Sequence, residues 1–380
     1  PCVCGVRDEG VENILTRGGD KPQNMIWVVK GEFAFQPTDD QVRADFERLC
    51  SRDAATFVDT QKGWTTRSSV PSKLHLYRML HTGQLLSMRF HWHHRVRTST
   101  LWHPSAHAIL QRRLREPAYL KDADERLQTL GGSAAAIDAR AAFRVIERNS
   151  ALLTVTHFRA TVSKHLCDVY RARDVLDFSA GWGDRLTGFL ASASVQSITL
   201  IDPRRGSIEG CVAQHSFVQS AKALHTHRAG AEVVMPTLAD QSYDLVVTSP
   251  PYLSMEKYGD TSEESEGQIR TRARTMEEYV DLFLRPVITH AARVLRPGGV
   301  LALNVDDNVV AGMFLCAPTL ALIDGLSDLQ FLGTAGLRKG RGFGKCVADD
   351  SAPRAEPIFL AQEREARLGR RPVGRESARG

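Results

Sequence analysis

The sequence has no apolar run long enough to cross a membrane, and its cysteines follow no metal-binding spacing. Seven cysteines are scattered over 380 residues, and only Cys2 and Cys4 lie close together. Without a second pair at zinc-site spacing, we expect free thiols and no metal site. These absences predict no transmembrane helix and an intracellular, reducing compartment, nuclear or cytoplasmic. The sequence begins with Pro1 and not Met, so organelle targeting stays open.

Apolar residues make up 42% of the chain and charged residues 24%, the balance of a globular protein of one or two domains. The net charge of +5 is unevenly distributed. Residues 61–120 contain ten Lys or Arg against one acid, Glu116, and seven of the 13 histidines. Several aromatic residues lie among these cations, a mixture that suits a polyanion whose bases can stack, such as nucleic acid. A solvated basic face with the aromatic rings in the core is an equally good interpretation.

Three regions differ in pattern. Residues 1–150 show no regular alternation of helix and strand, and we interpret them as a basic, mixed or mostly helical region that recognises nucleic acid. Residues 151–361 alternate apolar strands with amphipathic helices, which predicts an α/β domain with a parallel sheet covered by helices on both faces. Residues 362–380 are polar and rich in Arg, which is typical of a disordered tail.

Four strands can be placed in the second region, at residues 174–180, 197–202, 243–249 and 299–305. Between the last two strands, Thr275 and Glu278 form the T-x-x-E pattern of a capping box at a helix start. Pro286 lies inside that helix and should kink it.

The first of these strands leads into the sequence DFSAGWGDR. Gly181 and Gly183 allow the backbone to approach a ligand closely, and Asp202 follows nineteen residues after Gly183, at the end of the next strand. In nucleotide-binding α/β folds, an acid at about this interval binds the ribose hydroxyls. The combination predicts a nucleotide-type pocket.

A pyrophosphate fingerprint, G-x-G-x-x-G, is lacking, because Leu186 stands at its sixth position and Asp184 lies in the turn. A carboxylate there would repel a pyrophosphate but suits a cationic ligand such as S-adenosylmethionine, which carries an ammonium and a sulfonium group. Glu232 is placed to accept a hydrogen bond from an adenine amino group, although a solvated Glu is nearly as good an interpretation.

The third strand ends in Ser249-Pro250-Pro251-Tyr252. VLDFSAGWGDR followed by DLVVTSPPY resembles the S-adenosylmethionine-dependent methyltransferases that modify exocyclic amino groups of nucleic-acid bases, over roughly Thr154 to Leu360. The serine form of this motif resembles cytosine-N4 enzymes most, and the wider pattern is similar to poorly characterised methyltransferases of large DNA viruses, phages and protists. Within this span no Pro-Cys motif for methylation at carbon 5 is found. The resemblance implies a Rossmann-like class I methyltransferase sheet.

The resemblance also implies roles for residues at matching positions. Ser249 Oγ and the carbonyl of Pro250 would accept the amino protons, Pro251 would fix the turn and Tyr252 would stack on the base. The cofactor would be held by residues around the glycine loop and the next two strands: Phe158, Asp177, Ser179, Gly181, Gly183, Asp202 and Glu232. Trp182 departs from the small residue that many relatives carry in this loop, which leaves the geometry of the loop open.

Motif order leaves no space for a target-recognition domain between the glycine loop and the SPPY motif. Substrate contacts must therefore come from residues 1–150, such as Arg95 and Arg97, or from residues 253–275, which include Arg270 and Arg272. We expect methylation of DNA, with cytosine N4 favoured slightly over adenine N6. Methylation of RNA at adenosine N6, a catalytically silent nucleic-acid-binding partner of a methyltransferase and a small-molecule methyltransferase remain alternatives, and the oligomeric state is not predicted.

Overall fold

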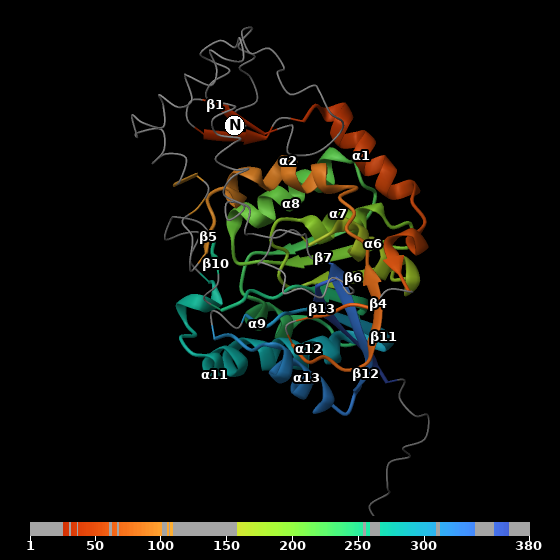
Figure 1. The fold of residues 1–380 in the computed structure, drawn as a ribbon, viewed down its shortest axis with the longest axis vertical. Helices are drawn as coiled ribbons and strands as arrows, with labels where there is room; N and C mark the ends of the chain where they lie inside the picture. Colours follow the sequence, from red (N-terminus) through yellow and green to blue (C-terminus); the bar gives the residue numbers. More distant parts are fainter. Residues whose placement is uncertain are drawn as a thin grey trace, which may run out of the picture.

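The computed structural model describes residues 26–29, 32–35, 37–60, 63–66, 68–100, 105, 107–108, 158–253, 256–258, 267–308, 312–338 and 353–364. Its centre is a nine-stranded sheet (Figure 1). The strands are β3 (Val58–Asp59), β4 (Lys73–Tyr77), β6 (Asp174–Asp177), β7 (Ser197–Ile201), β8 (Ala223–His227), β9 (Tyr243–Thr248), β11 (Leu295–Asn304), β12 (Leu329–Arg338) and β13 (Ala355–Glu363). They lie in the order β3-β4-β12-β13-β11-β9-β6-β7-β8.

Strand β13 is antiparallel to both of its neighbours, whereas β11, β9, β6, β7 and β8 pair in parallel. The four predicted strands of the second region are all present, as β6, β7, β9 and β11. The last of them begins earlier than predicted, because a register shift between Leu295 and Val300 lets the RPGG segment join the strand. The α/β fold class is therefore confirmed.

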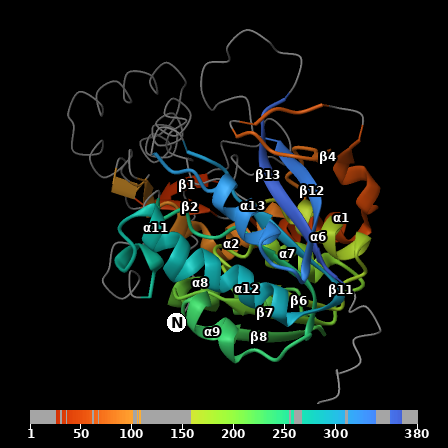
Figure 2. The same ribbon diagram turned by 90° about the horizontal axis from the view of Figure 1, so that it is seen from below.

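Helices cover both faces of the sheet (Figures 1 and 2). One face carries α6 (Ala160–Val169), α7 (Asp184–Ala191) and α8 (Arg205–Phe217), with α1 (Asp39–Ser51) and α2 (Gln84–Arg95) packed outside them. The other face carries α9 (Ala231–Val234), α11 (Met276–Tyr279), α12 (Arg285–Val294) and α13 (Cys316–Asp324). Within the described ranges, none of these helices combines the length and hydropathy that a membrane crossing requires.

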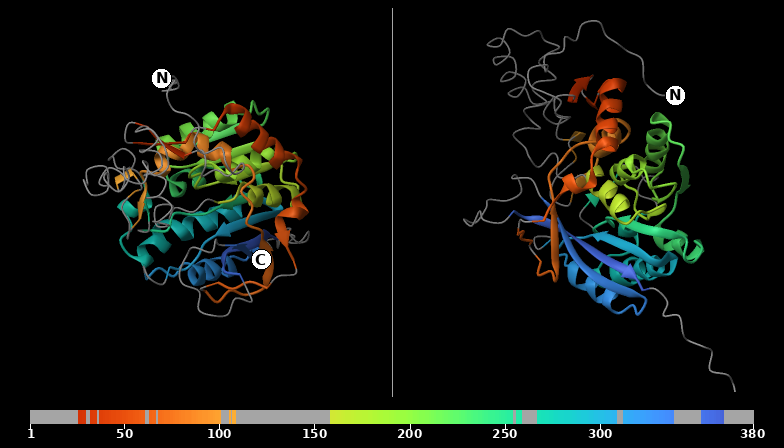
Figure 3. Two further views of the ribbon diagram at one scale, coloured as in Figure 1. Left: turned by 45° about the horizontal axis from the view of Figure 1, so that its top comes forward. Right: turned by 90° about the vertical axis from the view of Figure 1, so that its right-hand side faces the viewer.

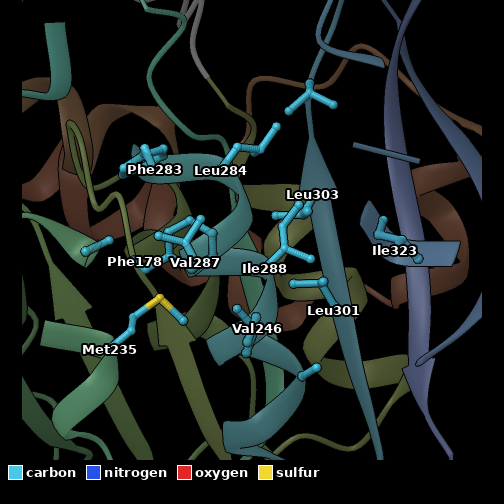
Figure 4. Packing of buried hydrophobic residues seen from close by; sticks show 14 of the residues in the cluster. Phe178, Met235, Val246, Phe283, Leu284, Val287, Ile288, Leu301, Leu303 and Ile323 are labelled. Carbon is cyan, nitrogen blue, oxygen red and sulfur yellow. The ribbon is translucent and has the colours of Figure 1, made fainter. Parts of the chain in front are cut away.

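Alternate strand residues face the two helical layers, as a pleated sheet requires. In β9, Leu245 and Val247 belong to the hydrophobic cluster under α6, α7 and α8, whereas Val246 belongs to the opposite cluster. Val287 and Ile288 of α12 pack in that second cluster (Figure 4). Because both faces are buried, these strands have continuous apolar sequences and no polar alternation.

The predicted capping box is present, with the Thr275 side chain and the Glu278 side chain each bonded to the other residue's backbone N–H. Past α11, the helix widens into a π-helical stretch at Val280–Leu284 before α12 begins at Arg285. Pro286, which has no N–H, is the second residue of α12 and follows directly on this π-helical stretch. The predicted irregularity lies in the turn that precedes the proline.

The N-terminal region contributes directly to the sheet. Strand β4 pairs in parallel with β12, and β3 pairs with β4 (Figure 3). The rest of its described part is mixed, with a hairpin of β1 (Ile26–Val29) and β2 (Glu32–Phe35), a 3-10 turn at Ala54–Phe57, and strand β5 (Ser99–Thr100). The domain division at residue 150 stays a prediction, because residues 109–157 lie outside the described residues. The predicted tail at 362–380 starts within β13, and residues 365–380 also lie outside the described residues.

Strand order reverses between β6 and β9, the two strands at the centre of the parallel part. From β6 the chain proceeds outward through β7 and β8, and it then returns to β9 on the other side of β6 and continues to β11. At such a reversal the loops that follow the two strands diverge, which leaves a crevice at their carboxyl ends. This position is where an open α/β sheet binds ligands.

Candidate active site

A pocket occupies this crevice, and it brings together most of the residues predicted from the sequence. Nine of the eleven residues assigned to catalysis or cofactor binding line it: Phe158, Ser179, Gly181, Asp202, Glu232, Ser249, Pro250, Pro251 and Tyr252. The other two, Asp177 and Gly183, lie directly behind its wall. Arg270 also lines the pocket. The predicted site residues therefore converge on one place, although the roles assigned to them stay predictions.

The glycine loop has the backbone that its two glycines permit. Gly181 has φ of +57° and Gly183 has φ of +67°, a region in which residues with a Cβ are strained. A Cβ on Gly183 would lie 1.9 Å from Nε2 of Gln214 and 3.0 Å from Nε2 of His91, whereas one on Gly181 would meet nothing closer than the Ser179 carbonyl at 3.6 Å. Gly183 therefore allows α2 and α8 to pack against the back of the loop.

Asp177 anchors this loop from inside the core. Its side chain is fully buried and accepts hydrogen bonds from Nε of Arg185 at 2.6 Å and from Oγ1 of Thr248 at 2.9 Å. It also accepts from the backbone N–H of Ser179 at 3.1 Å. Because Thr248 ends β9 and Ser179 follows β6, Asp177 ties together the two loops that form the crevice.

Asp202 holds the start of the glycine loop next to its own turn. One carboxylate oxygen accepts from the N–H of Gly181 at 2.9 Å and the other accepts from the N–H of Arg204 at 2.9 Å. Burial raises the pKa of this carboxyl, and the nearby Arg204 guanidinium and the two N–H groups oppose the rise only in part. Each oxygen retains a further acceptor position, and the residue lines the pocket, as a ribose-binding acid must.

Four carboxylates line the pocket: Asp184, Asp202, Glu232 and Glu356. Asp184 begins α7 and accepts a hydrogen bond of 2.5 Å from Oγ of Ser87 in α2. Glu232 forms an ion pair with Arg272, so this arginine, which the sequence suggested for nucleic acid, is bound to a predicted cofactor residue. Three arginines, Arg185, Arg204 and Arg270, also line the pocket, so its wall carries both signs of charge and includes carboxylates that could pair with a cationic group.

The SPPY turn leaves β9 and bends sharply into the pocket wall. The carbonyl of Pro251 accepts two hydrogen bonds, from the hydroxyl of Tyr279 at 2.7 Å and from the N–H of Leu253 at 3.1 Å. Leu253 has φ of 28°, an unusual value for a residue with a Cβ. No donor contacts the Pro250 carbonyl within the part of the chain that the structure describes. The turn is therefore fixed through Pro251, and Ser249 and Pro250 line the pocket beside it.

Several residues that line the pocket were not assigned a role from the sequence. They include Trp182, Arg204, Tyr258, Gln268, Asn304, Leu337 and Glu356. Asn304 ends β11 and donates from its side chain to the carbonyl of Pro357 at 2.9 Å, which braces the β11–β13 pair beside the site. A polar residue at the end of an apolar strand was the available signal for Asn304. The sequence carries no such signal for Leu337 and Glu356, because their position at the pocket depends on the pairing of β12 with β13.

The arginines suggested for substrate binding have three different environments. Arg270 lines the pocket. Arg95 ends α2 with its guanidinium 5.4 Å from the ring centre of Trp182, and it is 8% exposed. Arg97 follows α2 and is half-buried. Strand β5, just beyond it, pairs antiparallel with β10 (Glu256–Lys257), so the end of α2 is fastened to the segment after the SPPY turn (Figure 1).

Helix α2 also places histidines against the back of the site. His91 is fully buried beside Gly183 and Gly210, and burial holds its pKa well below the usual value. His94 lies over Gly206, and burial lowers its pKa to about 3. Both rings are therefore neutral near pH 7 and act as packing groups. Across the described residues, no group of three or more His, Cys, Asp or Glu side chains is placed to hold a metal ion.

Comparison with known proteins gives one family match. Residues 243–371 match the family model described as DNA methylase (N6_N4_Mtase). The match begins at the first residue of β9, includes the SPPY turn and covers about a third of the chain. The glycine loop and Asp202 lie before it. A search of curated proteins finds no match.

Solved structures give distant similarities. TrmN from Thermus thermophilus is 12% identical with a TM-score of 0.36; the match covers 54% of this chain and 48% of that protein, so the chain spans about half its length. Cofactor-bound Rv0187 from MTB is 17% identical with a TM-score of 0.37, over 56% of this chain and 84% of that one. The N-methyltransferase NodS from Bradyrhizobium japonicum WM9 is 10% identical with a TM-score of 0.36, over 54% and 94%.

Proposed function

We propose that the protein is an S-adenosylmethionine-dependent methyltransferase that modifies an exocyclic amino group of a nucleic-acid base. One observation carries the proposal: Ser249 and Pro250 line the same pocket as Gly181 and Asp202. The acceptors suited to an amino group and the loop suited to a nucleoside cofactor thus meet at one switch point of the sheet. The match of residues 243–371 to a DNA methylase family supports the proposal.

The lining of the pocket fits this cofactor. Asp202 offers a carboxylate to the ribose hydroxyls, and Gly181 lets the backbone approach closely. Asp184 and Glu232 supply negative charge for a ligand that carries an ammonium and a sulfonium. When bound there, S-adenosylmethionine would supply a methyl group on its sulfonium sulfur.

The chain's own residues act on the base. An amino group on cytosine or adenine is a weak nucleophile, because its lone pair is delocalised into the ring. Ser249 Oγ and the Pro250 carbonyl accept hydrogen bonds from its two N–H groups, which favours a tetrahedral nitrogen with its lone pair directed away from the two acceptors. Tyr252 offers its ring to the face of the base. Catalysis is then mainly a matter of position, and no covalent enzyme intermediate is needed.

The pocket lies at the carboxyl end of β9, and the amino group must enter it. A base that is stacked in a duplex cannot do so. The substrate is therefore either single-stranded or has its target base flipped out. We favour DNA, with cytosine N4 ahead of adenine N6, because the motif carries Ser249 and not Asn or Asp at its first position. RNA adenosine N6 is the second candidate.

The proposal is tested by incubating the protein with isotope-labelled cofactor and with DNA or RNA, followed by mass spectrometry of the released nucleosides. We expect label on N4-methylcytosine or N6-methyladenine. Ser249→Ala should abolish most of the product, whereas Ser242→Ala, at the opposite end of β9 in an exposed turn, should leave it unchanged.

Label on a ring carbon or a ribose oxygen would contradict the amino chemistry. Calorimetry separates a silent nucleic-acid-binding partner from an enzyme, since a silent protein would give no heat with the cofactor. If both polymers are methylated, comparison of the salt dependence of DNA and RNA binding identifies the better substrate.

A further inference from the structure

Two aromatic rings in contact, each with a guanidinium on its other side, form a row beside the pocket. The Arg95 guanidinium lies 5.4 Å from the ring centre of Trp182. The Trp182 and Tyr258 rings meet edge to face with centres 5.5 Å apart, and the Arg204 guanidinium lies 5.7 Å from the Tyr258 ring centre. We call these four residues the Trp182 row. Three of them, Trp182, Tyr258 and Arg204, line the pocket.

The row joins four segments, one of which is the turn before α8 that carries Arg204. Trp182 lies between the two glycines of the cofactor loop, Arg95 ends α2, and Tyr258 follows β10 just beyond the SPPY turn. The pairing of β5 with β10 holds the last two segments together. The row therefore lies where the loop suited to the cofactor, the SPPY segment and the basic N-terminal region meet.

Trp182 presents an unused donor at this point. The side chain is 8% exposed, and its indole N–H has no hydrogen-bond partner in the described part of the chain. A buried N–H without a partner costs about 1–3 kcal/mol, so buried indoles usually find an acceptor. Trp64 also has an indole N–H without a partner, and Nζ of Lys73 lies 5.1 Å from its ring centre. This indole packs beside β4 and β12, away from the pocket. Trp182 itself lines the pocket, so its unpartnered N–H lies within the pocket wall.

We propose that the Trp182 row is a nucleotide subsite, in which Trp182 and Tyr258 contact a base of the substrate strand. This inference rests on the proposed function and specifies how the strand is held. A base offers a π-face to the aromatic pair and ring nitrogens or carbonyls to the indole N–H. Arg204, beside Tyr258 in the pocket wall, provides positive charge for an adjoining phosphate, and Arg95 supports the Trp182 ring from outside the pocket lining. The subsite is additional to Tyr252, which lies in the SPPY turn itself.

The test compares two probes of equal length, about ten residues: a single-stranded oligodeoxyadenylate and a strand of abasic sugar-phosphate units. Binding is measured by fluorescence anisotropy. We expect the wild-type protein to prefer the base-bearing strand. Tyr258→Ala and Trp182→Leu should each reduce this preference about tenfold and leave affinity for the abasic strand unchanged. Damage to the fold alone would lower both affinities together.

Three control variants separate the contributions. Tyr258→Phe keeps the ring and should retain the preference. Trp182→Phe keeps a ring but deletes the N–H, and we expect an intermediate loss of about threefold. Trp64→Leu removes a comparable indole–cation pair away from the pocket, so it should lower thermal stability without changing the preference.

Unchanged preference in Tyr258→Ala and Trp182→Leu would overturn the subsite, as would a wild-type protein that binds both strands equally. Weaker cofactor binding in Trp182→Phe by calorimetry, with preference intact, would assign the indole to the cofactor and also overturn it. Either result would overturn the subsite but leave the proposal of methyl transfer standing. Conversely, the binding assay contains no cofactor, so a protein that transfers no methyl group would still report on the subsite.

Discussion

The hydroxyl of Tyr279 donates a hydrogen bond of 2.7 Å to the carbonyl of Pro251. Tyr279 ends α11 and is fully buried, and burial raises its pKa far above the usual value, so the hydroxyl stays protonated as a donor. Because Pro251 lies in the middle of the SPPY turn, this bond links the helix beyond the loop to the position of Ser249 and Pro250. The bond also gives the buried Tyr279 hydroxyl a partner.

Tyr279→Phe should therefore reduce kcat about tenfold while leaving cofactor affinity unchanged. The Pro251 carbonyl keeps the Leu253 N–H, but loses the contact that fixes the turn from the helix side. We expect a stability loss of about 1 kcal/mol, which is typical of one buried hydrogen bond. Methyl transfer kinetics and cofactor calorimetry measure the two effects.

Tyr243→Phe is the matched control for this variant. Tyr243 donates from its buried hydroxyl to Oγ1 of Thr199 at 3.1 Å, at the amino end of β9. Loss of this hydrogen bond should lower the free energy of unfolding by a similar amount, whereas kcat should remain at the wild-type value. Equal kcat losses in both variants would mean that Tyr279 acts through stability alone.

Tyr252→Ala should lower kcat/KM about tenfold to a hundredfold, because base stacking on an aromatic ring contributes about 1–3 kcal/mol. Cofactor affinity should not change. Tyr252→Phe retains the ring and should retain most activity. Full activity in Tyr252→Ala would show that the ring does not support the base.

Asp202→Ala should weaken cofactor binding about tenfold to a hundredfold, since hydrogen bonds to a charged group contribute about 1.5–3 kcal/mol. Binding needs the ionised carboxylate, so affinity is full above the pKa of Asp202 and falls as the pH decreases through it. Because burial raises this pKa, the fall should begin at a higher pH than for an ordinary carboxyl. Calorimetry over a pH series measures it, and Asp202→Asn should lack that part of the pH dependence. Unchanged affinity in Asp202→Ala would remove the residue from the cofactor site.

Gly183→Ala should destabilise the protein by about 3 kcal/mol and Gly181→Ala by about 1 kcal/mol, because left-handed strain applies to both but overpacking to one. A methyl group on Gly183 would collide with Gln214 and press on His91, whereas one on Gly181 meets no close neighbour. Chemical denaturation gives the two values. Equal losses would mean that α2 and α8 yield to the added group.

The sequence was sufficient for the central strands and for the convergence of the site. Strands β6, β7, β9 and β11 are buried on both faces, so their residues form continuous apolar runs that stop at polar site residues. The positions of Gly181, Asp202 and Ser249 at the ends of three such runs then follow from the parallel order. Local chemistry was equally informative at Thr275, where the capping box depends on neighbouring residues alone.

Contacts between distant segments could not be predicted in this way. The pairing of Arg272 with Glu232 and the stacking of Arg95 on Trp182 depend on how loops far apart in the sequence come together. The short strands β3, β4 and β5 have too few residues for a period to be visible. Asp177 was assigned to the cofactor from its place before the glycine loop. Only the fold shows that Arg185, Thr248 and the Ser179 N–H occupy its carboxylate.

Strand β4 also covers part of an edge of β12. It pairs along one side of β12, whose other side is paired with β13. Without β4, the backbone N–H and carbonyl groups of Thr334–Leu337 in β12 would lose their strand partners on that side, and an unpaired strand edge is a template for self-association. The segment that precedes the parallel part of the sheet thus protects a strand edge, and we expect its removal for crystallisation or expression to promote self-association.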